Sequence, residues 1–166
     1  MVKVSVCIPV FNMAAFIGKA IDSVLAQSFS DFEVVVCDNC SSDGTREILE
    51  NYSDPRVKVF YNETNIGMTG NFNRVLEKSS GTYIKILEAD DMLFPEALSW
   101  GVLMFEENPS VGLLSMEREV INTDGRILRK IPMTQEESIL DHQSNPMTEN
   151  GRRCHRYRLP PKAFQK

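Results

Sequence analysis

The sequence lacks any segment that would carry the chain into or across a membrane. No run approaches the roughly 20 apolar residues that a membrane-spanning helix needs. The first apolar run is short and Pro9 interrupts it, so it does not have the form of a secretory signal. Cysteine is also scarce, with four residues in 166. Without a secretory signal, these cysteines are expected to be reduced thiols in the cytoplasm.

Glycine-rich phosphate-binding loops are absent as well. The chain contains neither G-x-x-x-x-G-K-[ST] nor a G-x-G-x-x-G after its first predicted strand. This absence excludes a P-loop and a dinucleotide-binding fingerprint. It also argues against a nucleotidyltransferase, for which we expect a glycine-rich loop bearing lysine or arginine at that place. A nucleotide would therefore bind here without a glycine cradle for its phosphates.

Acids and bases are unevenly distributed along the chain. The net charge is −5, with 18 lysines and arginines against 23 aspartates and glutamates. Residues 151–166 hold six of the bases and no acid, which leaves 12 bases against 23 acids, a net charge of −11, in residues 1–150. An acidic body argues against nucleic acid as the main partner. Two interpretations of the basic tail stay open: contact with a phosphate-bearing surface, or a solvated linker.

Hydrophobic patterning predicts alternating strands and helices. Short apolar runs rich in β-branched residues predict five strands, at Lys3–Pro9, Phe32–Cys37, Val57–Tyr61, Tyr83–Leu87 and Val111–Ser115. Apolar positions at helical spacing predict four helices, at Ala14–Gln27, Thr45–Tyr52, Thr69–Lys78 and Glu96–Glu107. Gly81 is expected to supply the exit turn of the third helix. A hairpin is predicted last, with strands Glu119–Asn122 and Arg126–Ile131 around the turn signal Thr123-Asp124-Gly125.

This alternation predicts an α/β fold, a mostly parallel sheet flanked by helices on both faces. We expect residues 1–131 to form this domain. Residues 132–166 are expected to be an irregular basic tail, either the start of a further region missing from this sequence or a linker. Sheets of this kind bind ligands at the carboxyl ends of their strands. That rule gathers Pro9–Asn12, Asp38–Gly44 and Glu88–Asp91 at one edge.

Three acids directly follow the fourth predicted strand: Glu88, Asp90 and Asp91. Carboxylates this close repel one another unless a positive group lies among them. Mg²⁺ and Mn²⁺ prefer oxygen ligands, and Mg²⁺ usually takes one or two carboxylates. On its own the stretch is equally compatible with a solvated acidic turn and with a metal site that neutralises a diphosphate.

Asp38 and its neighbours also have two interpretations. An ionised carboxylate only accepts hydrogen bonds, so Asp38 could bind a base or a ribose, with Asn12, Asn39 and Ser41 adding polar contacts. Asp38, Asn39 and Asp43 equally suit turn and helix-cap chemistry. Both interpretations place these residues in the loop that follows the second strand.

Cys37 and Cys40 have the C-x-x-C spacing of thiol-redox motifs and follow a predicted strand. A reactive thiolate needs electropositive surroundings, whereas Asp38 lies between the two cysteines. We therefore expect no redox function for this pair.

Three segments taken together resemble the family 2 glycosyltransferases: VSVCIPVFN near the start, VVVCDNCSSDGT after the second strand, and NIGMTGNFNRVLEKSSGTYIKILEADDM. The resemblance covers about the first 115 residues in order, and its specificity lies in the joint pattern. The family consists of inverting enzymes of GT-A fold that use nucleotide-diphospho-sugars. The resemblance thus implies a GT-A form of the α/β fold and a nucleotide-sugar donor, with a UDP-sugar favoured.

The resemblance also implies site residues. It places Pro9, Phe11 and Asp38 around the nucleotide base and Asn65 and Gly67 in the loop beneath it. Asn12, Glu88 and Asp90 are also expected to contact the nucleotide-sugar. Glu88, Asp90 and Asp91 match the family's D-x-D-D element, with Mn²⁺ or Mg²⁺ on Asp90 or Asp91. The first acid of this element is usually aspartate, and Glu88 is one methylene longer.

The expected function is a metal-assisted transfer of a sugar, with inversion, to a hydroxyl of a saccharide or lipid-linked acceptor. We assign no general base, because the family's catalytic carboxylate lies in an acceptor-binding half downstream of the segment matched here. The chain is accordingly expected to be a donor-binding fragment or an inactive truncated protein, and the alternative function is a non-catalytic nucleotide-sugar-binding module. The expected location is the cytoplasm, or a peripheral position at the inner face of the membrane, with no transmembrane segment.

Overall fold

The structure, a computed structural model, describes residues 2–122 and 126–131. The predicted turn at 123–125 and the predicted tail at 132–166 lie outside these residues. The chain divides into two compact units, Met1–Val102 and Leu103–Lys166, and each is described by itself. The elements follow in the order β1 (Val4–Val10), α1 (Ile17–Leu25), β2 (Phe32–Asp38), α2 (Thr45–Glu50), β3 (Val57–Tyr61), α3 (Gly67–Glu77), β4 (Tyr83–Ile86), α4 (Ala97–Glu107), β5 (Arg118–Ile121) and β6 (Ile127–Ile131).

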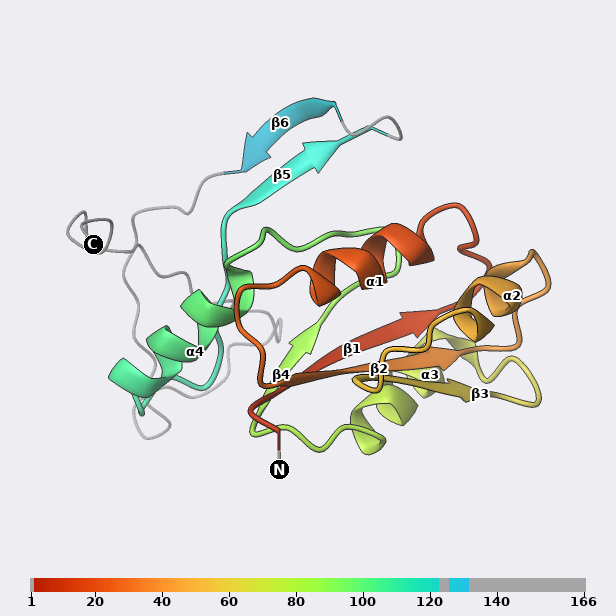
Figure 1. The fold of residues 1–166 in the computed structure, drawn as a ribbon, viewed down its shortest axis with the longest axis horizontal. Helices are drawn as coiled ribbons and strands as arrows, with labels where there is room; N and C mark the ends of the chain where they lie inside the picture. The colour runs from red at the N-terminus through yellow and green to blue at the C-terminus, as the bar shows by residue number, and fades with distance from the viewer. Residues whose placement is uncertain (1, 123–125, 132–166) are drawn as a thin grey trace, which may run out of the picture. The chain divides into compact units, whose positions relative to one another are not determined.

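The first unit is built on a parallel sheet in the order β3-β2-β1-β4, in which all three strand pairs are parallel (Figure 1). The predicted α/β architecture is therefore confirmed. From β1 the chain adds β2 and then β3 on one side, and afterwards adds β4 on the other side of β1. This reversal makes the carboxyl ends of β1 and β4 a topological switch point, the place where open α/β sheets bind ligands.

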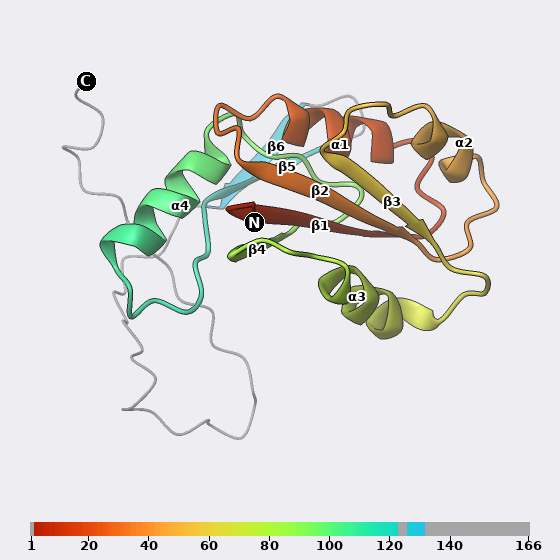
Figure 2. The ribbon, with the colours of Figure 1, turned by 60° about the horizontal axis from the view of Figure 1, so that its bottom comes forward.

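Helices cover both faces of this sheet, with α1 and α2 on one face and α3 on the other (Figure 2). Alternate residues of a strand point to opposite faces, and the strands divide accordingly into two apolar clusters. The larger cluster joins β1 and β2 to α1, α2 and the first turns of α4; its fully buried members include Val6, Ile8, Ile17, Ile21, Val24, Val34, Val36 and Leu49. The smaller one lies under α3 and contains Cys7, Val35, Cys37 and Val75. Burial on both faces explains why β1 and β2 are apolar almost throughout.

Pro9 lies inside β1 rather than ending it. The strand runs to Val10 and pairs with β2 up to Asp38, whereas its pairing with β4 stops at Cys7. On the β4 side, the Cys7 carbonyl accepts a hydrogen bond from the Leu87 amide at 3.0 Å. Because backbone polar groups two residues apart face the same side of a strand, the Pro9 nitrogen faces the β4 side beyond the last paired residue. The missing N–H therefore removes no ladder hydrogen bond.

The strand predicted at Val111–Ser115 does not form, and residues 111–114 are irregular. Gly112 and Leu113 are exposed, so the run packs only part of its length. A strand forms where its side chains pack against a half-buried surface, and the exposed middle of this segment has no such packing. The second unit instead contains the antiparallel pair β5–β6. Glu119 lies opposite Lys130 in this pair, and the two side chains form an ion pair with 2.7 Å between Lys130 Nζ and Glu119 Oε1.

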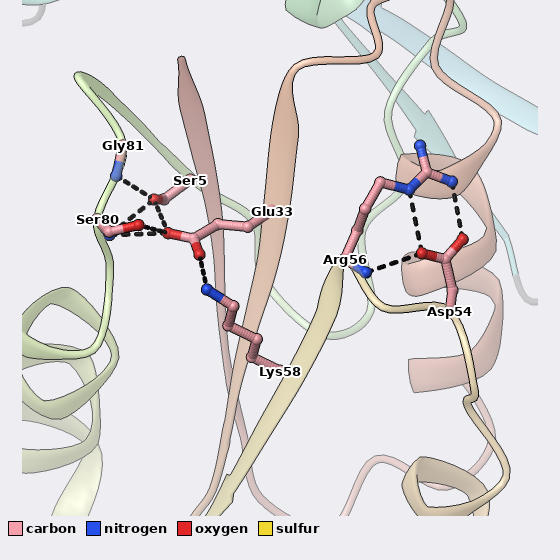
Figure 3. A network of polar contacts seen from close by, with 7 residues as sticks. All are labelled: Ser5, Glu33, Asp54, Arg56, Lys58, Ser80 and Gly81. Atoms are coloured by element: carbon pink, nitrogen blue, oxygen red, sulfur yellow. Dashed lines mark hydrogen bonds and ion pairs between the residues drawn. The ribbon is translucent and has the colours of Figure 1, made fainter. Parts of the chain in front are cut away.

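A polar network ties the amino ends of the strands together (Figure 3). Glu33, the second residue of β2, is 2% exposed. Its Oε1 accepts hydrogen bonds from the Ser5 hydroxyl at 2.6 Å and from the Ser80 amide and hydroxyl at 2.7 and 2.8 Å. Its Oε2 accepts one from Lys58 Nζ at 2.6 Å. Burial raises the pKa of this carboxyl, but the hydrogen bonds from Lys58, Ser5 and Ser80 outweigh burial and lower the pKa to about 2.

Gly81 has a role different from the predicted exit turn. Helix α3 ends at Glu77, and the next residue, Lys78, keeps a right-handed helical conformation. The Gly81 amide donates to the Ser5 hydroxyl at 2.7 Å, and a Cβ at Gly81 would lie only 2.5 Å from the Ser5 backbone nitrogen. Glycine is therefore needed for close approach to β1 (Figure 3).

Candidate functional site

All the predicted site residues except Asn65 and Gly67 lie at the carboxyl ends of three adjacent strands, β2, β1 and β4. Phe11 and Asn12 follow β1, Asp38 ends β2, and Glu88 comes two residues after β4. Since β1 lies between β2 and β4 in the sheet, these loops share one edge. Phe11 is 42% exposed, which leaves its ring accessible to a ligand.

The loops after β1 and β2 are cross-linked by side-chain hydrogen bonds. The backbone N–H of Asn12 donates to the Ser41 hydroxyl at 2.9 Å, and the Asn12 side-chain oxygen accepts from the backbone N–H of Ser42 at 2.9 Å. Asn12 and Cys40 both have positive φ, 53° and 67°. Such angles are uncommon outside glycine, and the two residues lie in the two loops that these hydrogen bonds join.

Asp43 adds a second link between the same loops. Its Oδ2 accepts from the Ala14 amide at 3.0 Å, while its Oδ1 accepts from the Thr45 amide and hydroxyl at 3.1 and 2.6 Å. The hydrogen bond from Ala14, together with those from Thr45, holds the pKa of the Asp43 carboxyl below its usual range. The N-cap of α2 is Gly44 and has no side-chain cap bond, so the bonds from Thr45 to Asp43 belong to the predicted turn chemistry and not to a helix cap.

Asp38 is 2% exposed. Ser41 supplies some of the hydrogen bonds that its carboxylate can accept. The Ser41 amide lies 3.3 Å from both carboxylate oxygens, and the Ser41 hydroxyl donates to Oδ1. A carboxylate can accept about four hydrogen bonds. The turn chemistry predicted for Asp38 is therefore present, and acceptor capacity remains; contact with a base or ribose stays a prediction.

Asn65 lies in the exposed loop between β3 and α3, and Gly67 is the exposed first residue of α3. The Asn65 side-chain oxygen accepts from the Gly67 amide at 2.8 Å and from Asn39 Nδ2 at 2.8 Å. Gly67 has φ of 78° and begins α3, a conformation that favours glycine. Two buried asparagines that support this loop, Asn62 and Asn71, were not singled out by sequence reasoning. Their signal was an asparagine directly after a strand and an asparagine one helical turn before buried Val75.

Glu88, Asp90 and Asp91 are exposed, and the Asp91 amide donates to the Glu88 carbonyl at 3.0 Å, so the acids lie on a tight turn. Ala89 between them is buried and anchors the turn to the core. Within the part of the chain that the structure describes, no three carboxylate, imidazole or thiol groups gather closely enough to hold a metal unaided.

The acids nevertheless fit a metal that shares its ligands with a substrate. Mg²⁺ is commonly bound through one or two carboxylates together with substrate phosphates and water, rather than by an all-protein cage. Asp90 and Asp91 offer two exposed carboxylates at the switch point of the sheet. Which of them would be a ligand, and whether Glu88 contributes, stay predictions.

Among the described residues, no helix is both long and apolar enough to span a membrane. The candidate site is formed by the carboxyl ends of the strands and the loops that follow them. Asn12, Asp43 and Asn39 bond neighbouring loops through their side chains.

Comparison with known proteins identifies glycosyltransferases as relatives. The model of the family described as "Glycosyl transferase family 2" matches residues 5–158. The chain is 34% identical over 121 residues to the Escherichia coli UDP-Glc:alpha-D-GlcNAc-diphosphoundecaprenol beta-1,3-glucosyltransferase WfgD, covering 73% of this chain and 47% of WfgD.

Solved structures agree with the sequence relatives. S. aureus TarS in complex with UDP-GlcNAc superposes with a TM-score of 0.64 at 33% identity, covering 69% of this chain and 34% of the TarS chain. The mannosyltransferase PcManGT from Pyrobaculum calidifontis, solved with GDP-Man and Mn²⁺, gives a TM-score of 0.63 at 24% identity, covering 73% of this chain and 36% of that one. At that identity the second likeness shows the fold alone, and both confirm the expected GT-A fold.

The chain thus matches less than half of the length of WfgD and about a third of TarS. Apart from Val4, the region that the family model matches includes the four strands of the parallel sheet and the loops at their carboxyl ends. The chain belongs to glycosyl transferase family 2.

Proposed function

We propose that this chain binds a nucleotide-diphospho-sugar across the carboxyl ends of β1, β2 and β4 and transfers the sugar, with inversion, to an acceptor hydroxyl. The observation that carries the proposal is the sheet order, which places a switch point between β1 and β4 beside an exposed aromatic ring and three acids. A UDP-sugar is the favoured donor, since WfgD is named for UDP-Glc and TarS was solved with UDP-GlcNAc.

Each part of the edge has a proposed task. Pro9 and Phe11 form an apolar wall for the base, and Asp38 accepts hydrogen bonds from the base or ribose with the capacity that Ser41 leaves free. The Asn65–Gly67 loop lies beneath the base. Its left-handed glycine lets the backbone turn into α3 at that point.

The diphosphate is assigned to the turn after β4. Asp90 and Asp91 would hold Mn²⁺ or Mg²⁺ there, with Glu88 beside them on the same turn. A bound divalent cation would stabilise the charge that builds on the leaving diphosphate. The two carboxylates alone would repel a diphosphate, so donor binding at this turn should depend on the cation.

Inversion requires the acceptor hydroxyl to attack the sugar carbon on the face opposite the leaving diphosphate, with a base removing its proton. No residue of this chain is assigned to that step. The acceptor is proposed to be a saccharide or a lipid-linked sugar, the class printed in the name of WfgD. Such an acceptor would place the protein in the cytoplasm or at the inner face of the membrane.

Calorimetry with UDP-GlcNAc and UDP-Glc tests donor binding, with Mn²⁺ present and again after excess chelator. Binding is expected to weaken at least about tenfold on chelation, which corresponds to about 1.4 kcal/mol. Asp90→Asn and Asp91→Asn, made singly, should each reduce the effect of Mn²⁺, and the larger loss identifies the metal ligand. Asp31→Asn is the matched control, because Asp31 is exposed and directly precedes β2, at the opposite end of that strand.

Equal donor affinity with and without chelator would remove the metal from the proposal. Turnover distinguishes the enzyme from the non-catalytic module: slow donor hydrolysis, or transfer to an added acceptor, supports the enzyme. Tight metal-dependent binding with no release of UDP over hours supports the module instead.

A further inference from the structure

Four asparagine side chains form a connected cluster between the carboxyl ends of the strands and the start of α3. Asn39 follows β2, Asn62 follows β3, Asn65 lies in the next loop, and Asn71 is on α3. Asn39, Asn62 and Asn71 are buried. We call these four residues the asparagine cluster. Neither the turn chemistry of Asp38 and Asp43 nor the proposed metal site uses the three buried members.

The hydrogen bonds give every amide in the cluster one orientation. Asn71 Nδ2 donates to the Cys37 carbonyl at 2.8 Å and to the Val10 carbonyl at 3.5 Å, so its Oδ1 faces Asn62. Asn62 Nδ2 donates to the side-chain oxygens of Asn71 and Asn39, at 3.0 and 2.9 Å. The Cys37 and Val10 carbonyls fix the orientation of Asn71, and Asn71 in turn fixes that of Asn62. Reversing the Asn62 amide would place its oxygen against the side-chain oxygens of Asn71 and Asn39.

The last step of this chain reaches the loop. With its Oδ1 facing Asn62, Asn39 donates from Nδ2 to Asn65 Oδ1 at 2.8 Å and to the Gly67 carbonyl at 3.3 Å. Asn39 Oδ1 also accepts from the Ile66 amide at 3.0 Å. Three hydrogen bonds from one buried side chain therefore bind the Asn65–Gly67 segment to the carboxyl end of β2.

Little else holds this loop. Residues 63–69 are all exposed, so no buried apolar side chain anchors the segment. Asn62 Oδ1 is buried and has no hydrogen-bond partner among the described residues. A buried unsatisfied oxygen costs free energy, and in this orientation Asn62 Nδ2 donates to both Asn71 and Asn39. The cluster is thus directional, from the sheet toward the loop.

We propose that Asn39, Asn62 and Asn71 are positioning residues that preform the Asn65–Gly67 loop for the nucleoside part of the donor. This inference rests on the proposed function. A preformed loop needs no ordering when the nucleotide binds, and avoiding that entropy cost raises affinity. The effect should appear on nucleoside binding and not on the response to the metal, because Asp90 and Asp91 lie on a different loop.

Asn39→Ala removes all three bonds to the loop, and Asn62→Ala removes the donors that orient Asn39. Asn73→Ala is the matched control, an exposed asparagine on α3 outside the cluster. Hydrogen exchange measured by mass spectrometry reports the loop amides of residues 63–68, with the amides of β1 and β2 as an internal reference. UDP binding is measured by calorimetry with Mn²⁺ and with chelator.

In Asn39→Ala we expect the loop amides to exchange about tenfold faster, with unchanged exchange in β1 and β2. UDP affinity should fall by a similar factor, while the ratio of affinities with and without Mn²⁺ stays as in the wild type. Asn62→Ala should give the same pattern with a smaller change, and it decides the matter if Asn39→Ala does not fold. Asn73→Ala should match the wild type.

The inference is overturned if loop and strand amides accelerate together, since the cluster would then only stabilise the fold. It is also overturned if the loop loosens and UDP affinity does not change. A wild-type chain that binds no nucleoside diphosphate would sink the proposed function and the nucleotide role of the cluster. Hydrogen exchange would still show separately whether the amides hold the loop.

Discussion

The replacement Glu33→Gln tests how the amino ends of the strands are held. Glutamine keeps the size of the side chain and an oxygen that can accept from Ser5 and Ser80. Its amide group would, however, face the ammonium of Lys58, which now donates to Glu33 Oε2 at 2.6 Å. The replacement therefore turns one strong charge-assisted hydrogen bond into a contact between two donors.

The pKa of Glu33 gives the expected magnitude. The folded chain lowers it from 4.5 to about 2, and one pKa unit corresponds to about 1.4 kcal/mol, so the ionised carboxylate contributes about 3 kcal/mol at neutral pH. Because the folded pKa lies below the unfolded one, this contribution is complete above pH 4.5 and is lost as the pH falls toward 2. Half-exposed Lys58 is screened by solvent, which makes about 3 kcal/mol an upper value.

Urea denaturation of both proteins at pH 7 and pH 4 measures the effect. We expect Glu33→Gln to lower the free energy of unfolding by about 2–3 kcal/mol at pH 7. Because part of the wild-type contribution is already lost at pH 4, the difference should shrink there by about 1 kcal/mol. Glu47→Gln, an exposed glutamate on α2, is the control and should change little. A difference below about 0.5 kcal/mol at pH 7, or one that is the same at both pH values, would refute the role assigned to the ion pair.

Two further outcomes follow from close packing and burial. Gly81→Ala should destabilise the chain by about 2 kcal/mol or more in urea denaturation, because the new Cβ would lie 2.5 Å from the Ser5 backbone nitrogen. At pH 7, iodoacetamide followed by peptide mass spectrometry should label exposed Cys40 in the native chain. Burial raises the pKa of Cys7 to about 12 and that of Cys37 to about 11, so these two thiols should react only after unfolding.

Each of these outcomes has a control that separates it from a general loss of structure. Gly18→Ala on α1 places its Cβ 3.7 Å from the Tyr52 hydroxyl, an ordinary contact. It should therefore be neutral or stabilise the helix by up to about 1 kcal/mol. A Gly81→Ala protein as stable as Gly18→Ala would contradict the close-approach argument. Native labelling of Cys37 at the rate of Cys40 would reopen the redox interpretation of the C-x-x-C spacing.

Hydrophobic periodicity was enough to predict the architecture of the first unit. Strands and helices alternate in the sequence, and that alternation requires crossover connections and a parallel sheet. The strand order is a different matter, because nothing in the sequence pattern places β4 beside β1 rather than beside β3. The position of Pro9 shows the same limit: proline ends most strands, but here the β4 side of β1 is already unpaired at that residue.

Prediction of the candidate site was limited because the role of a polar side chain depends on its hydrogen-bond partners, which the sequence does not show. A carboxylate after a strand predicts either a cap or a ligand, and only the contacts of Asp43 show that its oxygens are taken by Ala14 and Thr45. Buried Asn62 and Asn71 were overlooked because an isolated asparagine reads as a loop residue. Their role depends on partners far away in the sequence, namely the side chain of Asn39 and the backbone carbonyls of Val10 and Cys37.

Turn chemistry and ligand binding, the two interpretations of the polar residues at the carboxyl edge of the sheet, do not exclude each other. Loops that receive a polar ligand must stay open to solvent, so few of their apolar side chains can be buried, as Ala89 is. Much of their order comes from polar side chains that bond the next loop, as Asn12 bonds Ser42 and Asn39 bonds the Asn65–Gly67 segment. Turn chemistry at a strand end is then the means by which a site is preorganised. On this argument, replacing such a residue should loosen one loop and weaken donor binding, with a smaller effect on the stability of the sheet below.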